Sequence, residues 1–400
     1  MVSSKLDFST TCSLTNFETK PTCRQLLQWH LHHTHYRPKS LSGMSYGIFL
    51  FLFLQVLSHN HACVRNFSPA WFAINMGTGV ISSLFHSFPY GGDSKVMNGF
   101  ALGFFFLNIF LFITFLALSM ACFSMFPRNW TSMLHHPVQS LYLGCFPMGA
   151  DTLITVGISV VSQYWGFGGN AFVYVLWGFW WLDGILSFLC CFGLVYIMYV
   201  SHLIILSSVK SCQTRATGQD HSMSTFTPLW LLPVVTLIVC SSTGQLLAQS
   251  LIQIHLPHAF LTMGVSVVMV FIGISLALMI LTVYMRRILI DGLPELDMII
   301  SSFLPLGPCG QAGYSLLLAG QNFKATLPWG AGDVLGDDLS GRILNVCCLF
   351  AAFLLWCLGV WWLILAFIAI GDVLLRGHRI PFKLAFWGIV FPNVCILTIR

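Results

Sequence analysis

The chain has 400 residues, of which 56% are hydrophobic and 8% are charged, and its formal net charge is +5. Soluble domains carry about 25% charged residues, because a water-facing surface needs them. The composition, with a mean hydropathy of +0.81, therefore excludes a soluble globular protein and predicts a multispanning membrane protein.

The first 65 residues precede the long apolar segments and have little globular character. The motif HLHHTH (30–35) could bind a metal, but no second cluster of ligands accompanies it, so a solvated tail is the favoured interpretation. The apolar segment 46–57 is too short to span a bilayer and lies too far from the start for a signal peptide. We therefore predict an N-terminal segment over 1–65 and a transmembrane domain over 66–400.

Nine later segments are long and apolar enough to be membrane-spanning helices. A bilayer core of about 30 Å needs roughly 20 apolar residues per helix. The segments cover residues 70–88, 97–123, 140–164, 172–200, 228–251, 259–285, 298–318, 343–369 and 381 onward. We therefore expect an all-α membrane protein.

One proline-marked apolar motif recurs on each odd-numbered helix, at intervals that leave room for two helices. The five prolines are Pro69, Pro147, Pro233, Pro305 and Pro392. Proline kinks a helix and frees a backbone carbonyl, which lipid does not tolerate unless protein or water satisfies it. The pattern predicts repeated helical hairpins, with bent odd-numbered helices around a central pore and even-numbered helices outside. The alternative is that proline is simply common in membrane helices.

The cationic residues predict the orientation. Fourteen of the 18 Lys and Arg residues lie before the first helix or in alternate connections, whereas the opposite connections contain only Lys95, Lys324 and Arg342. The positive-inside rule therefore predicts that the N-terminus and the basic loops are cytoplasmic. A basic inner mouth would also concentrate anions.

Three aspartates, Asp151, Asp183 and Asp372, lie within or at the ends of the spans. A charge at mid-bilayer costs about 2.5 to 3.5 kcal/mol, so a deeply placed Asp should face protein or water. Asp151 follows Pro147 and is the best candidate for a proton-linked group. The equal alternative is a neutral Asp that is hydrogen-bonded between helices.

The odd-numbered helices contain almost no cations and offer glycines, hydroxyls and amides instead. The predicted pore-lining residues of this kind are Thr78, Thr152, Thr243, Gln311 and Ser315. Such a lining binds an anion weakly, which suits passage better than capture.

Other motifs exclude several functions. The 14 cysteines include no CxxC pair, so we interpret them as small buried hydrophobic residues. The chain contains no Walker A or GxGxxG motif. We therefore expect neither transport driven directly by ATP hydrolysis nor a bound cofactor.

Four long phrases resemble one known family. They are NFSPAWFAINMGTGVISSLFHSFPY, HPVQSLYLGCFPMGADTL, FLPLGPCGQAGYSLLLAG and FWGIVFPN. They resemble the tellurite-resistance and dicarboxylate transporter family, most closely its fungal sulfite efflux pumps. Bacterial tellurite-resistance proteins, plant guard-cell slow anion channels and yeast malate carriers are relatives in the same family.

The resemblance implies ten helices in five hairpins, with the odd helices lining a central pore, and a trimer in which each subunit has its own pore. It also implies a phenylalanine gate on the ninth helix, and Phe391 beside Pro392 matches that position. After this phrase the chain reads CILTIR and ends. We therefore expect the family fold to be truncated within helix nine, with helix ten missing.

These observations predict a transporter that exports sulfite or bisulfite across the plasma membrane, with no enzymatic activity and no nucleic acid partner. A C4-dicarboxylate carrier such as a malate permease is the close alternative. The rival from another class is a histidine-based membrane metalloenzyme, supported only by the 14 histidines. These histidines are mostly scattered singly and form no paired HxxxH set.

Overall fold

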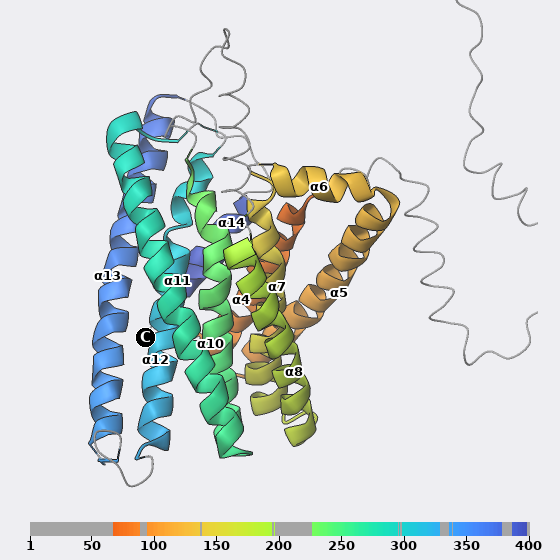
Figure 1. The fold of residues 1–400 in the computed structure, drawn as a ribbon, viewed down its shortest axis with the longest axis vertical. Helices are drawn as coiled ribbons and strands as arrows, with labels where there is room; N and C mark the ends of the chain where they lie inside the picture. Colours follow the sequence, from red (N-terminus) through yellow and green to blue (C-terminus); the bar gives the residue numbers. More distant parts are fainter. Residues whose placement is uncertain are drawn as a thin grey trace, which may run out of the picture. The chain divides into compact units, whose positions relative to one another are not determined.

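The computed structural model describes residues 67–88, 94–136, 138–193, 196, 226–294, 296, 298–328, 336–337, 339–377 and 386–397. All of them belong to one unit, Asn60–Arg400. Every regular element among these residues is helical (Figure 1). The predicted N-terminal segment 1–65 lies outside the described residues.

A helix occupies each of the nine predicted spans. The inner helices are α4 (Phe72–Ser87), α7 (Cys145–Val156), α10 (Leu232–Ile252), α12 (Leu306–Thr326) and α14 (Trp387–Leu397). The outer helices are α5 (Lys95–Met125), α8 (Gly169–Phe188), α11 (Leu256–Asp291) and α13 (Ser340–Leu375). Only helices satisfy every backbone donor and acceptor internally within a single segment in lipid, which is why hydropathy locates these elements.

Short helical turns extend several of these helices. Four inner helices start with a 3-10 turn, namely η1 (Pro69–Trp71), η2 (Leu141–Gly144), η6 (Pro228–Leu231) and η7 (Ile299–Phe303). The π-helical turns η3 (Gly157–Tyr164) and η4 (Leu189–Gly193) continue α7 and α8. The short helix α6 (Pro127–His135) follows α5 and lies across the end of the helices (Figure 1).

Six of the described helical segments are long and apolar enough to cross a membrane. The most apolar windows of two inner segments, Pro228–Ile252 and Leu141–Tyr164, are 100% and 72% buried, whereas those of the four outer segments are 17% to 39% buried. The prediction that odd-numbered helices lie inside and even-numbered helices outside is confirmed for these segments.

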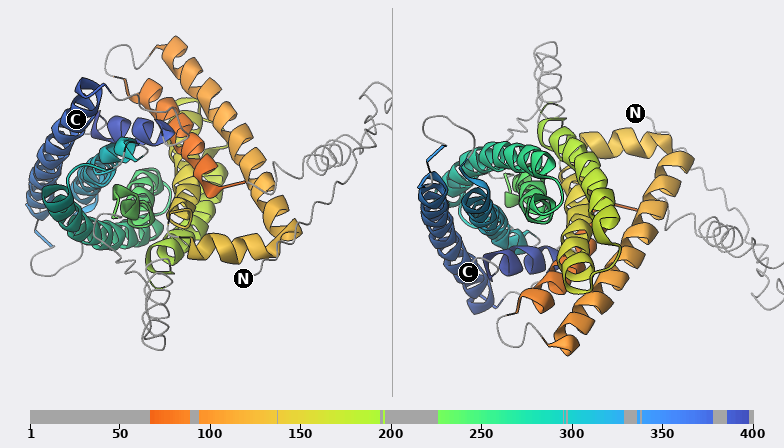
Figure 2. Two further views of the ribbon diagram at one scale, coloured as in Figure 1. Left: turned by 90° about the horizontal axis from the view of Figure 1, so that it is seen from above. Right: turned by 90° about the horizontal axis from the view of Figure 1, so that it is seen from below.

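The five inner helices pack against one another in a closed ring, in the order α4, α7, α10, α12, α14 and back to α4. Figure 2 shows this ring end on, with α5, α11 and α13 outside it. Glycines bring neighbouring backbones together: a Cβ on Gly310 would lie 2.7 Å from the carbonyl carbon of Cys395, and one on Gly144 would lie 2.8 Å from the carbonyl oxygen of Leu232. Small residues at such contacts let membrane helices approach closely.

The five prolines lie on the inner helices, as predicted, but not at equivalent positions within them. Pro69 is the first residue of η1, Pro305 is the N-cap of α12, and Pro147 and Pro233 lie in the first turns of α7 and α10. A 3-10 turn precedes α7, α10 and α12, so Pro147, Pro233 and Pro305 lie near the point where that turn becomes an α-helix. Pro392 lies inside α14. Of the five, Pro69 is the one that marks the start of its helical segment.

The inner helices run parallel, so they all start at one end of the ring. The outer helices α5, α11 and α13 finish at that same end, which carries Arg128, Arg286, Arg287 and Arg376. We call it the basic end. Each helix N-terminus adds about half a positive charge, so the five starts reinforce the arginines electrostatically.

Candidate functional site

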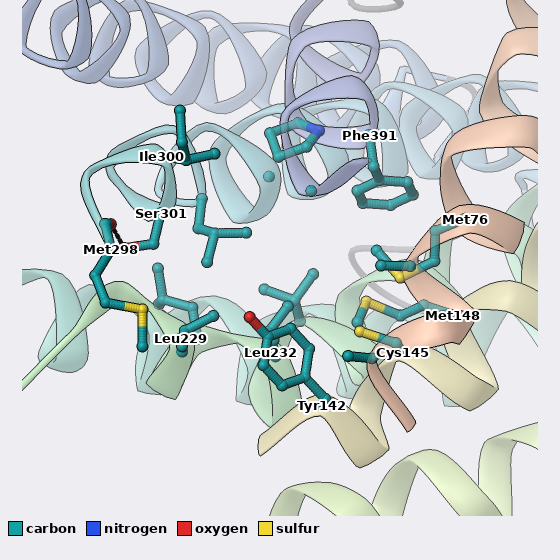
Figure 3. A pocket seen from close by; sticks show the side chains of 18 residues that line it. Met76, Tyr142, Cys145, Met148, Leu229, Leu232, Met298, Ile300, Ser301 and Phe391 are labelled. Carbon is teal, nitrogen blue, oxygen red and sulfur yellow. Dashed lines mark hydrogen bonds between the residues drawn. The ribbon is translucent and has the colours of Figure 1, made fainter. Parts of the chain in front are cut away.

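A cavity of about 110 Å³ lies inside the ring at the basic end. All five inner helices or their 3-10 turns contribute to its lining. The lining is almost entirely apolar and rich in sulfur, and includes Met76, Cys145, Met148, Leu232 and Met298 (Figure 3). We call it the first cavity.

A second cavity, of about 70 Å³, lies farther along the same ring. Its lining is more polar and includes the hydroxyl or amide groups of Ser83, Ser87, Thr152, Thr155 and Gln311. These residues come from later turns of α4, α7 and α12 than those that line the first cavity. The two cavities therefore follow one another along the axis of the ring.

Phe391 borders both cavities. Its side chain is 3% exposed, and Figure 3 shows the ring pointing toward Met76 and Met148. The neighbouring Pro392 has no N–H, so the carbonyl of Gly388 loses its usual partner within α14. The ring of Phe391 thus lies between the apolar cavity and the hydroxyl-lined one.

Hydrogen bonds between helices orient the polar groups of the second cavity. The hydroxyl oxygens of Thr155 and Thr243 lie 3.1 Å apart, which joins α7 to α10. The amide of Asn108 on α5 donates to the Thr152 hydroxyl over 3.2 Å. Gln311 of α12 donates to the hydroxyl of Ser242 on α10. The lining is therefore held in place by the outer as well as the inner helices.

Neither cavity has a Lys, Arg or His among the described residues that line it. The available donors are hydroxyls and amides in the second cavity, while the positive charge lies in the arginines and helix starts of the basic end. An anion would be attracted to the basic end but would bind weakly inside, as rapid passage requires.

Four of the predicted site residues line a cavity: Phe391, Pro392, Thr152 and Gln311. The other eight lie off both cavities, namely Pro69, Thr78, Pro147, Asp151, Pro233, Thr243, Pro305 and Ser315. Some of them form hydrogen bonds within or between helices instead. The Thr78 hydroxyl donates to the Ile74 carbonyl over 2.8 Å, and the Ser315 hydroxyl lies 2.7 Å from that of Ser241.

The sequence interpretation missed Thr155, Ser83 and Ser87, although a signal was present. Thr155 lies three residues after Thr152, and Ser87 lies four residues after Ser83, so each pair shares one face of its helix. No comparable signal distinguishes Met76 or Met148 from ordinary core methionines.

A buried polar cluster lies beside the second cavity. One carboxylate oxygen each of Asp151 and Asp183 and the sulfur of Cys240 lie within 4.8 Å of one another. The three residues come from α7, α8 and α10 and are at most 2% exposed. No fourth potential ligand joins them among the described residues. Two carboxyls and one thiol fall short of the four ligands of a structural zinc site and of the six oxygens that magnesium prefers.

This cluster contains no histidine, and it is the one group of three or more His, Cys, Asp and Glu residues with metal-ligand spacing in the described part of the chain. The histidine-based enzyme alternative therefore gains no support from the described residues.

Comparisons with known proteins agree with this architecture. A family model described as voltage-dependent anion channel matches residues 66–399. The sulfite efflux pump of Arthroderma benhamiae is 32% identical over 82% of this chain and 79% of its own length. The sulfite efflux pump of Candida albicans is 32% identical over 66% of this chain and 50% of its own length. The malic acid transport protein of Schizosaccharomyces pombe is 20% identical over 83% of this chain and 69% of its own length.

Proposed function

The chain belongs to the voltage-dependent anion channel family, and from that premise we propose that it exports sulfite or bisulfite through the ring of its inner helices. The observation that carries the proposal is the pair of cavities on the ring axis, separated by Phe391. No covalent chemistry, cofactor or nucleic acid is needed for this activity.

The basic end supplies the attraction. The five parallel helix starts and the arginines Arg128, Arg286 and Arg287 raise the local concentration of anions there. The apolar first cavity then offers no cation that would trap the ion. The hydroxyls of the second cavity replace part of its hydration shell after it passes Phe391.

The size of the cavities favours a compact anion. Volumes of about 110 and 70 Å³ exceed the roughly 10 to 15 Å³ that one water molecule needs, so each cavity can hold a few small groups. An anion with three oxygens such as sulfite fits this space more easily than a four-carbon dicarboxylate. The sulfite pumps are also more similar to this chain than the malic acid transporter is.

The charge distribution supports a cytoplasmic basic end, with the N-terminus on the same side. Of the 18 Lys and Arg residues, 14 belong to the N-terminal segment or to the connections at this end. An exporter in this orientation collects its substrate from the cytoplasm. The plasma membrane as its location and a trimer with one pore per subunit are parts of the proposal that rest on the family resemblance.

Anion efflux from vesicles tests the proposal. The full chain is reconstituted into liposomes loaded with sulfite or with malate, and the release of each anion is measured against protein-free liposomes. We expect sulfite to leave faster than malate. Faster malate release would favour the dicarboxylate alternative, and sulfite release at the protein-free rate would refute the proposed transport.

A further inference from the structure

We propose that Asp151 and Asp183 together form a proton-binding site that is reached from the second cavity through the hydroxyls of Thr155 and Thr243, and that its occupancy controls anion flux. The inference rests on the proposed anion transport, but the proton site can be tested without it.

The two carboxyl groups are buried, close together and poorly satisfied. Asp151 is 0% exposed and Asp183 is 2% exposed, and one carboxylate oxygen of each lies within 4.8 Å of the other. Within the part of the chain that the structure describes, neither oxygen of Asp151 has a well-formed hydrogen bond, and Asp183 accepts only from the Ser187 hydroxyl, over 3.5 Å. Burying even one carboxylate without partners is costly, and burying two side by side is more so. A proton shared by the pair removes most of that cost.

No cation replaces the proton among the described residues. The groups that interact with the carboxyls are Thr243 and Cys240 of α10 and Ser187 of α8, and the thiol of Cys190 in η4 lies near Asp183. None of them is basic. The ion pair that the described residues contain, Arg376 with Asp372 over 2.9 Å, lies at the C-terminal end of α13.

A chain of hydroxyls links the pair to the second cavity. Thr155 lines that cavity, and its hydroxyl oxygen lies 3.1 Å from that of Thr243. Thr155 follows Asp151 by four residues on α7, and Thr243 follows Cys240 by three residues on α10, so both hydroxyls lie on the helix faces that carry the cluster. The Thr243 hydroxyl donates to the Val239 carbonyl over 3.1 Å and has to rotate to donate to the carboxyl. In one transfer, a hydronium ion in the cavity gives a proton to the Thr155 hydroxyl, Thr155 gives its own proton to Thr243, and Thr243 gives its own to the Asp151 carboxylate. The hydronium becomes water and the carboxylate becomes a carboxylic acid.

The site can influence the anion because it adjoins the route. Asp151 precedes Thr152, which lines the second cavity. When the pair has lost its proton, the negative charge beside this cavity repels an anion, and when the pair is protonated the repulsion is absent. Anion flux should therefore rise as protons occupy the site.

Infrared spectroscopy of the reconstituted full chain tests the site itself. A protonated carboxylic acid has its own carbonyl band, and we expect such a band at neutral pH in the wild-type protein. The double substitution Asp151→Asn and Asp183→Asn should remove it, whereas Asp372→Asn, which changes a half-exposed carboxylate in the ion pair, should leave it. A spectrum in which the double substitution removes no such band would overturn the proton site.

The path has its own test, which also applies if the double substitution prevents folding. Thr243→Val keeps the shape of the side chain but removes the hydroxyl, so exchange of the carboxyl proton for deuterium should slow by roughly tenfold or more. Thr262→Val, at a buried hydroxyl bonded to Trp177, is the matched control and should exchange at the wild-type rate. Equal rates in Thr243→Val and wild type would overturn the path.

Flux measurements test the link to transport. We expect the ratio of sulfite release by the double variant to release by the wild type to increase with pH, reaching roughly three- to tenfold. Titration of sulfite itself affects both proteins equally and cancels in the ratio. A ratio that is constant across pH would overturn the link. Absence of flux in the wild type would instead refute the proposed transport, while the infrared band still decides the proton site.

Discussion

Removing the ring of Phe391 should open the path between the two cavities. The side chain is 3% exposed and borders both of them, so Phe391→Ala would join an apolar space to a hydroxyl-lined one. If the wild-type ring must leave its preferred rotamer to let an anion pass, each passage costs about 0.5 to 1.5 kcal/mol. Eliminating that cost should raise flux by roughly two- to tenfold.

The same substitution has a cost in stability. Truncating a buried Phe lowers the free energy of unfolding by about 3 to 5 kcal/mol in a packed core. We expect the lower part of that range for Phe391, because its ring already borders empty space and makes fewer contacts there.

Phe303→Ala is the matched control. Phe303 is 4% exposed and packs edge-on against Phe367 of α13, with ring centroids 5.6 Å apart, and it lines neither cavity. Sulfite efflux is measured in liposomes and divided by the amount of folded protein, determined by size-exclusion chromatography. Flux per molecule that is no higher in Phe391→Ala than in Phe303→Ala would remove Phe391 from the gating role.

Three further predictions concern packing and topology. Gly310→Ala should lower the free energy of unfolding by about 1 to 3 kcal/mol, since its Cβ would meet the backbone of α14. Gly264→Ala enters open space and should not lower the melting temperature, because alanine favours a helix more than glycine does. Equal melting temperatures for the two variants would contradict the close contact. Asn322→Ala should lower the free energy of unfolding by about 1 to 3 kcal/mol, because it removes the amide that donates to the buried Gln245 side chain over 2.9 Å. Adding Gln245→Leu should recover part of this loss. Thermal unfolding of both variants in detergent measures the two effects. The Asn129 sequon lies at the basic end and should remain unglycosylated, so a glycan mapped to it by mass spectrometry would reverse the proposed orientation.

The sequence alone was sufficient to locate the helices and to separate the inner from the outer ones. In lipid, a single segment can satisfy its backbone hydrogen bonds only by forming a helix, so long apolar segments identify the spans. Prolines at regular intervals then identified the inner helices, and three of them lie where a 3-10 turn becomes an α-helix. The predicted gate position, Phe391, came from a resemblance between phrases and not from residue chemistry.

Hydropathy could not show which faces meet. The segments Pro228–Ile252 and Gly169–Gly193 are similarly hydrophobic, yet their most apolar stretches are 100% and 39% buried. A protein interior and lipid are equally apolar, so a helix that is hydrophobic on all sides carries no stripe that fixes its rotation. Eight of the twelve predicted site residues accordingly lie off both cavities.

The tertiary structure decided the contacts that give the site its chemistry. Asp183 meets Asp151 across α7 and α8, and Thr155 meets Thr243 from 88 residues away in the sequence. Such pairs depend on the tilt and rotation of each helix within the ring, which close glycine contacts set. The spacing of residues along one helix shows which of them share a face of that helix. Only the packing of the ring determines which faces of different helices contact one another.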